Sequence, residues 1–118
     1  ADPLRNQCTD GRLDQLYNAF ELMRLLDREM PGQLVSCFLY VSSHDGCHAN
    51  AMAEALDLTP ASSSRNTDIL SAGRTGRTAK GLGLISKESD LTNRRRHVLT
   101  LTPRGKLLAQ QMKSHIFG

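Results

Sequence analysis

Two threonine–proline pairs limit how this chain of 118 residues can fold. In Thr59-Pro60 and in Thr102-Pro103 the threonine can cap a helix. The proline can then occupy the first helical position, where its missing N–H costs nothing. Helices are therefore expected to begin at residues 60 and 103, and each of the other predicted elements must lie before, between or after these two points.

Three helical segments are expected before residue 59. From about residue 10 to residue 30, apolar side chains recur at steps of three and four, which is typical of one face of an amphipathic helix. After Pro31-Gly32 the apolar residues of 34–41 predict a second helix, which ends in the turn-forming residues 42–46. Residues 48–58 predict a short, alanine-rich helix.

The helix expected from Pro60 to about Ala72 is poorly suited to a hydrophobic core. Only Ala61, Ile69 and Leu70 are apolar in its first eleven residues, and most of the others can form hydrogen bonds. A short helix, a turn and a second, polar helix make a helix-turn-helix. The second helix of that motif fits the major groove of DNA and reads the edges of the bases there.

Two β-rich runs, residues 84–88 and 97–102, enclose a polar tip with three consecutive arginines. They predict a β-hairpin with a basic tip, followed by a last amphipathic helix from Pro103. The expected fold is mostly α with a small β-hairpin (α+β). We expect one domain over residues 4–118, with a DNA-binding lobe at 31–102.

Charge is distributed unevenly along the chain. Residues 1–64 hold four Arg and nine Asp or Glu (4 − 9 = −5), whereas residues 65–106 hold ten Lys or Arg and three Asp or Glu (10 − 3 = +7). A basic half of this kind favours a polyanionic partner, although a basic surface also serves solubility. The predicted DNA-binding residues are Thr59, Ser62, Ser64, Arg65, Asn66, Arg74, Arg77, Lys80, Lys87, Arg94, Arg95 and Arg96.

These side chains are expected to play different parts on DNA. Arg65 can form a bidentate pair with guanine, and Ser and Asn side chains can bond to several bases. Arg74, Arg77, Lys80 and Lys87 are expected to contact phosphates, which position a protein without reading sequence. One arginine of the hairpin tip can enter a narrow minor groove.

The stretch from Met30 to about Lys113 resembles the winged helix-turn-helix of MarR-type regulators. The resemblance is carried by residues 53–56 (AEAL), 59–65 (TPASSSR), 83–85 (GLI) and, most specifically, 93–105 (NRRRHVLTLTPRG). It implies that residues 59–72 form the recognition helix and that Arg95 is the wing arginine directed at the minor groove. It further implies a winged helix-turn-helix with N- and C-terminal dimerisation helices, at about residues 10–30 and 103–117, which hold a homodimer. Such regulators often bind a small-molecule effector between the dimer and DNA-binding lobes.

The chain departs from the family pattern in three places. Ser63, Asn66 and Thr67 stand where the family usually has apolar residues, and Asn93 stands where an aspartate commonly anchors the wing arginine. The glycine-rich loop after Leu70 is also longer than usual. The residues predicted to form the dimer interface are Leu13, Leu16, Tyr17, Phe20, Leu108, Met112 and Ile116.

Enzymatic and metal-binding functions find little support in the sequence. His44, Cys47 and His48 could bind zinc, but no second pair of ligands is near in sequence. Residues 73–81 lack the Gly-Lys-Ser/Thr ending of a phosphate loop. We therefore expect no enzyme, no catalytic residue, no metal and no cofactor. Either Cys8 or Cys47 would need a lowered thiol pKa to act as a redox sensor.

The odd count of three cysteines favours a reducing compartment, and no apolar run is long enough to span a membrane. We expect a cytoplasmic, nucleoid-associated protein of prokaryotic or viral origin that regulates transcription by binding specific double-stranded DNA. Two other functions stay open. One is a winged-helix protein-interaction module, an adaptor or antagonist of another regulator or a polymerase. The other is a DNA-replication initiator-type protein.

Overall fold

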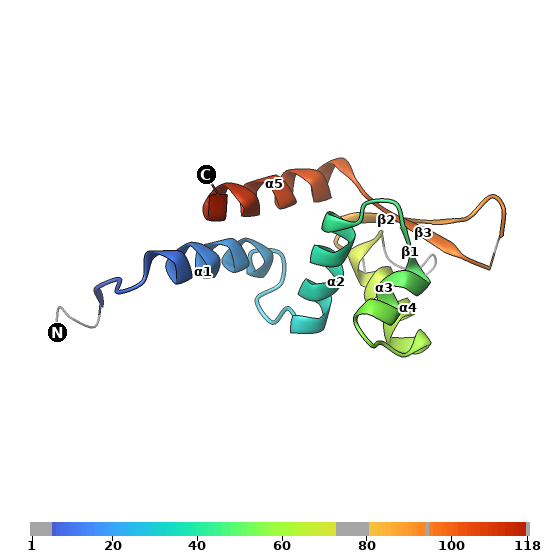
Figure 1. Cartoon of the computed structure of the whole chain (residues 1–118), viewed down its shortest axis with the longest axis horizontal. Coiled ribbons are helices and arrows are strands. Elements are labelled where there is room, and N and C mark those ends of the chain that lie inside the picture. The colour runs from blue at the N-terminus through green and yellow to red at the C-terminus, as the bar shows by residue number, and fades with distance from the viewer. Residues whose placement is uncertain (1–5, 73–80, 94, 118) are drawn as a thin grey trace.

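The computed structural model of this chain describes residues 6–72, 81–93 and 95–117 (Figure 1). In these ranges the helices are α1 (Gly11–Arg24), α2 (Gly32–Ser43), α3 (Ala49–Ala55), α4 (Pro60–Leu70) and α5 (Pro103–Phe117). The strands are β1 (Cys47–His48), β2 (Ile85–Ser89) and β3 (His97–Leu101). The predicted α+β fold, with a polar fourth helix followed by a β-hairpin and a last helix, is confirmed.

Both predicted helix starts are confirmed by their caps. Thr59 Oγ1 accepts a hydrogen bond of 3.1 Å from the N–H of Ser62, and Pro60 is the first helical residue. Thr102 Oγ1 likewise accepts a 3.0 Å bond from the N–H of Gly105. The first helix is shorter than predicted, because it ends at Arg24 and residues 25–31 form turns and extended chain.

The sheet has one strand more than the predicted hairpin. β1 pairs antiparallel with β3, which also pairs antiparallel with β2, so the strand order is β1-β3-β2. Gly46 turns the chain into β1 with a positive φ of 89°, and its N–H donates a 2.9 Å bond to the carbonyl of Leu99. The helix expected to start at residue 48 therefore starts one residue later, and Cys47 and His48 belong to the sheet.

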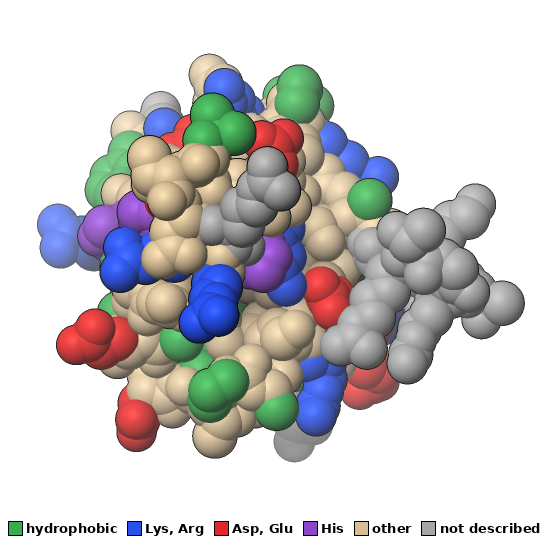
Figure 2. All heavy atoms as spheres, turned by 90° about the vertical axis from the view of Figure 1, so that its right-hand side faces the viewer, with side chains coloured by type: hydrophobic (Ala, Val, Ile, Leu, Met, Phe, Trp, Pro, Cys, Tyr) green, Lys and Arg blue, Asp and Glu red, His purple; other side chains and the backbone are tan. Residues whose placement is uncertain are grey.

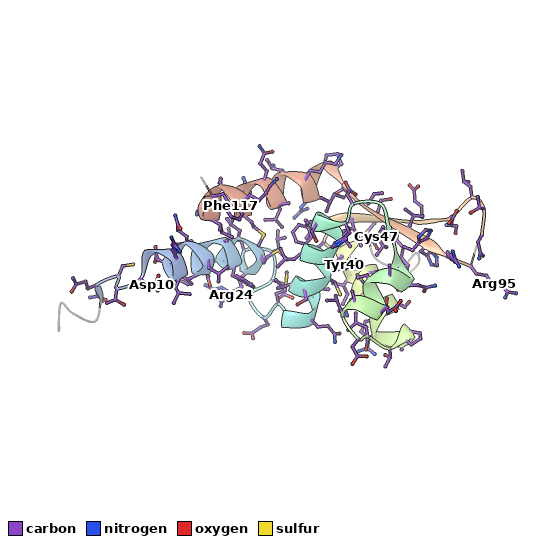
Figure 3. All side chains as sticks on the ribbon, in the orientation of Figure 1. Asp10, Arg24, Tyr40, Cys47, Arg95 and Phe117 are labelled. Atoms are coloured by element: carbon purple, nitrogen blue, oxygen red, sulfur yellow. The ribbon has the colours of Figure 1, made fainter. Side chains whose placement is uncertain are left out.

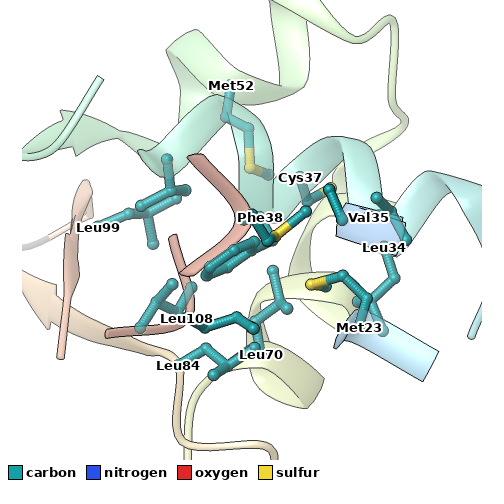
Figure 4. Packing of buried hydrophobic residues seen from close by; sticks show 14 residues of the cluster. Met23, Leu34, Val35, Cys37, Phe38, Met52, Leu70, Leu84, Leu99 and Leu108 are labelled. Atoms are coloured by element: carbon teal, nitrogen blue, oxygen red, sulfur yellow. The ribbon is translucent and has the colours of Figure 1, made fainter. Parts of the chain in front are cut away.

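The hydrophobic core lies around α2, which contributes five buried residues to it. Phe38 is fully buried at its centre, among side chains from α4, β3 and α5 such as Leu70, Leu99 and Leu108 (Figure 4). Burying a side chain of this size stabilises a fold by roughly 1.5–3 kcal/mol. The core thus joins the helix-turn-helix, the sheet and the root of α5.

The root of α5 lies directly against the strand that leads into the hairpin. A Cβ atom at Gly105 would collide with the carbonyl oxygen of Leu84. Thr102 also joins the start of α5 to this segment, since its hydroxyl donates a 2.7 Å bond to the carbonyl of Gly83. Only glycine allows this close approach of helix and strand.

The molecule is elongated, because α1 and α5 pack along each other and extend away from the rest of the chain (Figure 1). Its extents are 59 × 30 × 27 Å and its radius of gyration is 16.3 Å. A compact domain of this length would have a radius of gyration of about 13.5 Å. No helix in the described part of the chain has the length and apolar character needed to cross a bilayer.

Candidate nucleic-acid interface

The helix-turn-helix and the hairpin, hereafter the wing (β2, β3 and residues 90–96), lie at the end of the molecule opposite the N-terminus (Figure 1). Figure 2 looks onto this end, where Lys and Arg side chains are interspersed with acidic, hydrophobic and histidine side chains. The turn between α3 and α4 is tight. Asp57 adopts a left-handed φ of 54°, and the N–H of Leu58 donates a 2.8 Å bond to the carbonyl of Ala53.

Helix α4 has an exposed face and a buried face. Ala61, Arg65 and Ile69 are exposed at steps of four residues, as expected for one side of a helix. Arg65 forms no hydrogen bond or ion pair with any other residue that the structure describes. Its guanidinium is therefore available to an outside partner.

The remaining predicted residues around the start of α4 divide between the two faces. Thr59 is exposed but uses its hydroxyl to cap the helix. Ser62 and Ser64 are half-buried beside Arg65. These three residues and Arg65 are brought together at one end of the helix-turn-helix.

Asn66, which we expected to contact DNA, lies on the buried face of α4. Its Nδ2 donates a 2.7 Å hydrogen bond to Oε1 of Gln33 at the start of α2. Thr67, also buried, donates from its hydroxyl to the carbonyl of Ser63 at 2.9 Å. The polar side chains that replace the usual apolar ones are thus satisfied within the subunit, and Asn66 is turned away from the surface expected to meet bases.

Lys87, a predicted phosphate contact, is turned toward α4. Its Nζ lies 3.2 Å from Oδ1 of Asp68, and its side chain is only 16% exposed. A partly buried ion pair of this kind compensates the charge of the lysine. The arrangement joins the wing to α4 instead of presenting Lys87 freely to a phosphate.

The tip of the wing is held by local hydrogen bonds. Asn93, which replaces the usual aspartate, accepts a 3.1 Å bond from the N–H of Arg95 through its Oδ1. It therefore holds the backbone of the wing arginine, while the side chains of Arg95 and Arg96 are exposed. Figure 3 shows Arg95 at the far end of the wing, pointing away from the molecule. The predicted residues Arg74, Arg77, Lys80 and Arg94 lie outside the described residues.

A contact that the sequence did not reveal joins the wing to the helix-turn-helix. Nε2 of His48 lies 2.9 Å from Oδ2 of Asp90, across 42 residues of sequence. The pKa of Asp90 is lowered to about 2, chiefly by the N–H of Thr92 and then by the side chain of His48. Nothing in the spacing of two residues so far apart could have indicated this pair.

The predicted dimerisation residues also divide into two sets. Leu13, Leu16, Tyr17 and Phe20 are exposed on α1. Leu108 and Met112, by contrast, are buried in the core of their own subunit, and Ile116 is half-buried against it. The exposed set continues into an open groove of about 480 Å³ between α1, α2 and α5.

The possible zinc ligands do not converge. His44 stacks on Tyr40 with ring centroids 4.2 Å apart, whereas His48 bonds to Asp90. No group of three or more His, Cys, Asp or Glu side chains that could hold a metal ion occurs among the described residues. Burial raises the pKa of Cys47, the opposite of what a reactive thiol requires, and raises that of Cys37 to about 11.

Comparisons with known proteins identify the fold. No protein-family model matches the chain, and no curated protein matches it. A MepR–DNA complex from S. aureus superimposes with a TM-score of 0.66 at 21% identity, covering 87% of this chain and 74% of MepR. MarR itself gives a TM-score of 0.60 at 21% identity, over 87% of this chain and 73% of MarR.

A third similar structure, AbfR bound to DNA, gives a TM-score of 0.63 at 16% identity, over 88% of this chain and 68% of AbfR. In all three comparisons the likeness covers nearly nine-tenths of this chain. The chain therefore has the winged helix-turn-helix fold of the MarR-type regulators.

Proposed function

We propose that this protein is a transcription regulator that binds specific sequences in double-stranded DNA as a homodimer. Helix α4 would enter the major groove, and the wing would contact the backbone and the minor groove. The observation that carries the proposal is the exposed guanidinium of Arg65 on α4, which pairs with no other described residue and lies at the same end of the molecule as the exposed arginines of the wing tip. Similar structures have been solved as complexes with DNA, which supports the same role here.

The homodimer is supported by the apolar surface of α1. Leu13 and Tyr17 are 63% and 60% exposed, and Leu16 and Phe20 are exposed beside them. A contiguous apolar surface of this kind is typical of an interaction site. The groove of about 480 Å³ beside them would receive apolar side chains of the second subunit. Two lobes related by a twofold axis would meet an inverted repeat whose halves lie about one helical turn apart.

Selection of bound sequences from random duplex DNA, followed by binding measurements with Arg65→Ala, tests the proposal. If Arg65 pairs with a guanine, the variant loses about 1–3 kcal/mol on the selected site and much less on unrelated DNA. Arg12→Ala, which removes an exposed arginine of α1, is the matched control and should bind like the wild type. Equal losses on both DNAs with Arg65→Ala would contradict base reading by this residue.

The wing is tested by the salt dependence of the same binding. Each phosphate contact that is lost reduces the slope of log K against log salt concentration by about one. Replacing Arg95 and Arg96 together by alanine should therefore flatten the slope of the wild type. An unchanged slope would place the wing outside the interface.

A protein-docking function is favoured by one observation on α4. Ile69 and Ala61 are exposed on the same face as Arg65, so that face has apolar as well as charged character. In that case the selection would recover no common sequence, and DNA binding would be weak. Such a result would replace the DNA-binding proposal with the docking function.

A further inference from the structure

The pair formed by His48 and Asp90 links the wing tip to the helix-turn-helix through side chains. We propose that His48 is a positioning residue: its imidazole, bound to the carboxylate of Asp90, fixes the wing tip relative to the helix-turn-helix. The consequence for DNA affinity rests on the function proposed above. The positioning itself concerns the free protein.

The geometry of the pair determines how it is bonded. Nε2 of His48 and Oδ2 of Asp90 are 2.9 Å apart, within hydrogen-bonding distance. An ionised carboxylate only accepts hydrogen bonds, so Nε2 must carry the proton. The contact is therefore a hydrogen bond when the imidazole is neutral and a hydrogen-bonded ion pair when it is charged.

Asp90 is suited to transmit this hold because its groups organise the tip of the wing. Its Oδ1 accepts 2.9 Å and 2.8 Å bonds from the N–H and the hydroxyl of Thr92. Its N–H donates to the carbonyl of Arg96 at 2.8 Å, and its carbonyl accepts from the N–H of Asn93 at 3.2 Å. A displacement of this carboxylate would therefore also displace the turn that carries the arginines.

His48 is fixed at its other end. It pairs with Val98 of β3 through β1, and it occupies the N-cap position of α3, the first helix of the helix-turn-helix. The side chain therefore starts from a point shared by the sheet and α3 and reaches the far end of β2. A hairpin anchored only at its base can swing, whereas this contact holds it near the tip.

Amide hydrogen exchange of the free protein tests the positioning. The reporters are the N–H groups of Asn93 and Arg96, whose bonds close the wing tip. At pH 6, His48→Ala should lower their protection factors by about three- to tenfold, the size expected for a partly exposed charged hydrogen bond. His115→Ala removes an exposed histidine of α5 and should change neither reporter.

His48→Gln separates positioning from a general effect on folding. Glutamine retains an N–H donor, so it should restore part of the protection. Protection factors equal to those of the wild type in both His48 variants would overturn the inference. A loss spread evenly over α2 and α5 amides would do the same, because it would signal a structural role only.

The effect on DNA is measured separately, on the selected site. His48→Ala should weaken binding about three- to tenfold at pH 6. Arg95→Ala added to His48→Ala should weaken binding less than Arg95→Ala does in the wild type. If the wild type binds no DNA, the proposed function fails and the exchange experiment still decides the positioning. If exchange changes but affinity does not, His48 positions the wing without serving DNA binding, and that part of the inference is wrong.

Discussion

Gly105 shows at the scale of a single residue how closely the terminal helix is fitted to the sheet. Replacing it with alanine should destabilise the protein by about 1–3 kcal/mol, because the added methyl group meets the backbone oxygen of Leu84 and backbone cannot move aside as a side chain can. Urea unfolding measures the loss. Gly11→Ala, at the start of α1 with open space around it, is the control and should be neutral or slightly stabilising. Equal stability of the two variants would contradict the predicted collision.

The carboxylate of Asp90 should make stability depend on pH in the acid range. Because its pKa is lowered to about 2 in the folded state, it stays ionised there while the unfolded chain takes up a proton near pH 4. Its stabilising effect is therefore complete above that range and lost as pH falls toward 2. The difference in Tm between wild type and Asp90→Asn should shrink between pH 5 and pH 2. A difference that stays constant over this interval would show that the pKa is not lowered.

At the scale of an element, α4 is attached to α2 by a pair of amides. Replacing Gln33 with leucine removes the acceptor of the buried Asn66 side chain and should cost about 1–2 kcal/mol. Replacing both residues with leucine should cost less than the sum of the two single changes, because no polar group is then left without its partner. A double-mutant cycle in urea measures the coupling, expected to be at least about 0.5 kcal/mol. Strict additivity would mean that the two amides do not depend on each other.

The same helix shows which features of the fold could be predicted from sequence. Its start was predictable because a capping threonine followed by proline is a local signal. Which side faces inward was not, because polar residues occur all round α4 and no apolar stripe marks the buried face. Asn66 was therefore expected at the DNA, whereas it bonds to Gln33.

The sheet has one part that could be predicted from the sequence and one that could not. The β2–β3 hairpin was predictable from its β-rich runs and polar tip, but β1 spans only two residues and has no periodicity of its own. The contact between His48 and Asp90 depends on that strand and could not be foreseen without it. Lys87 was expected at a phosphate. Its pairing with Asp68 is likewise a tertiary contact, which the sequence does not indicate.

At the scale of the whole molecule, the proposed homodimer would form through the extended arms made by α1 and α5. Replacing Leu13 and Tyr17 together with lysine should convert a dimer into a monomer at micromolar concentration, because both side chains are exposed and the subunit's own core does not need them. Sedimentation velocity measures the change, and an unchanged circular dichroism spectrum shows that the subunit is still folded. Leu91→Lys at the wing tip, where the leucine is 100% exposed, is the control and should leave the mass unchanged. A monomeric wild type would contradict the proposed assembly.

The single residue between β3 and α5 leaves no slack in the chain. Thr102 bonds through its N–H to Leu84 and through its hydroxyl to Gly83 and Gly105, and it is flanked directly by β3 and α5. Because one residue joins β3 to α5, a rotation of the arm is expected to move the wing with it. In a dimer, any event that changes the angle at which the arms cross would therefore swing both wings, and would alter the distance between the two sites that they span.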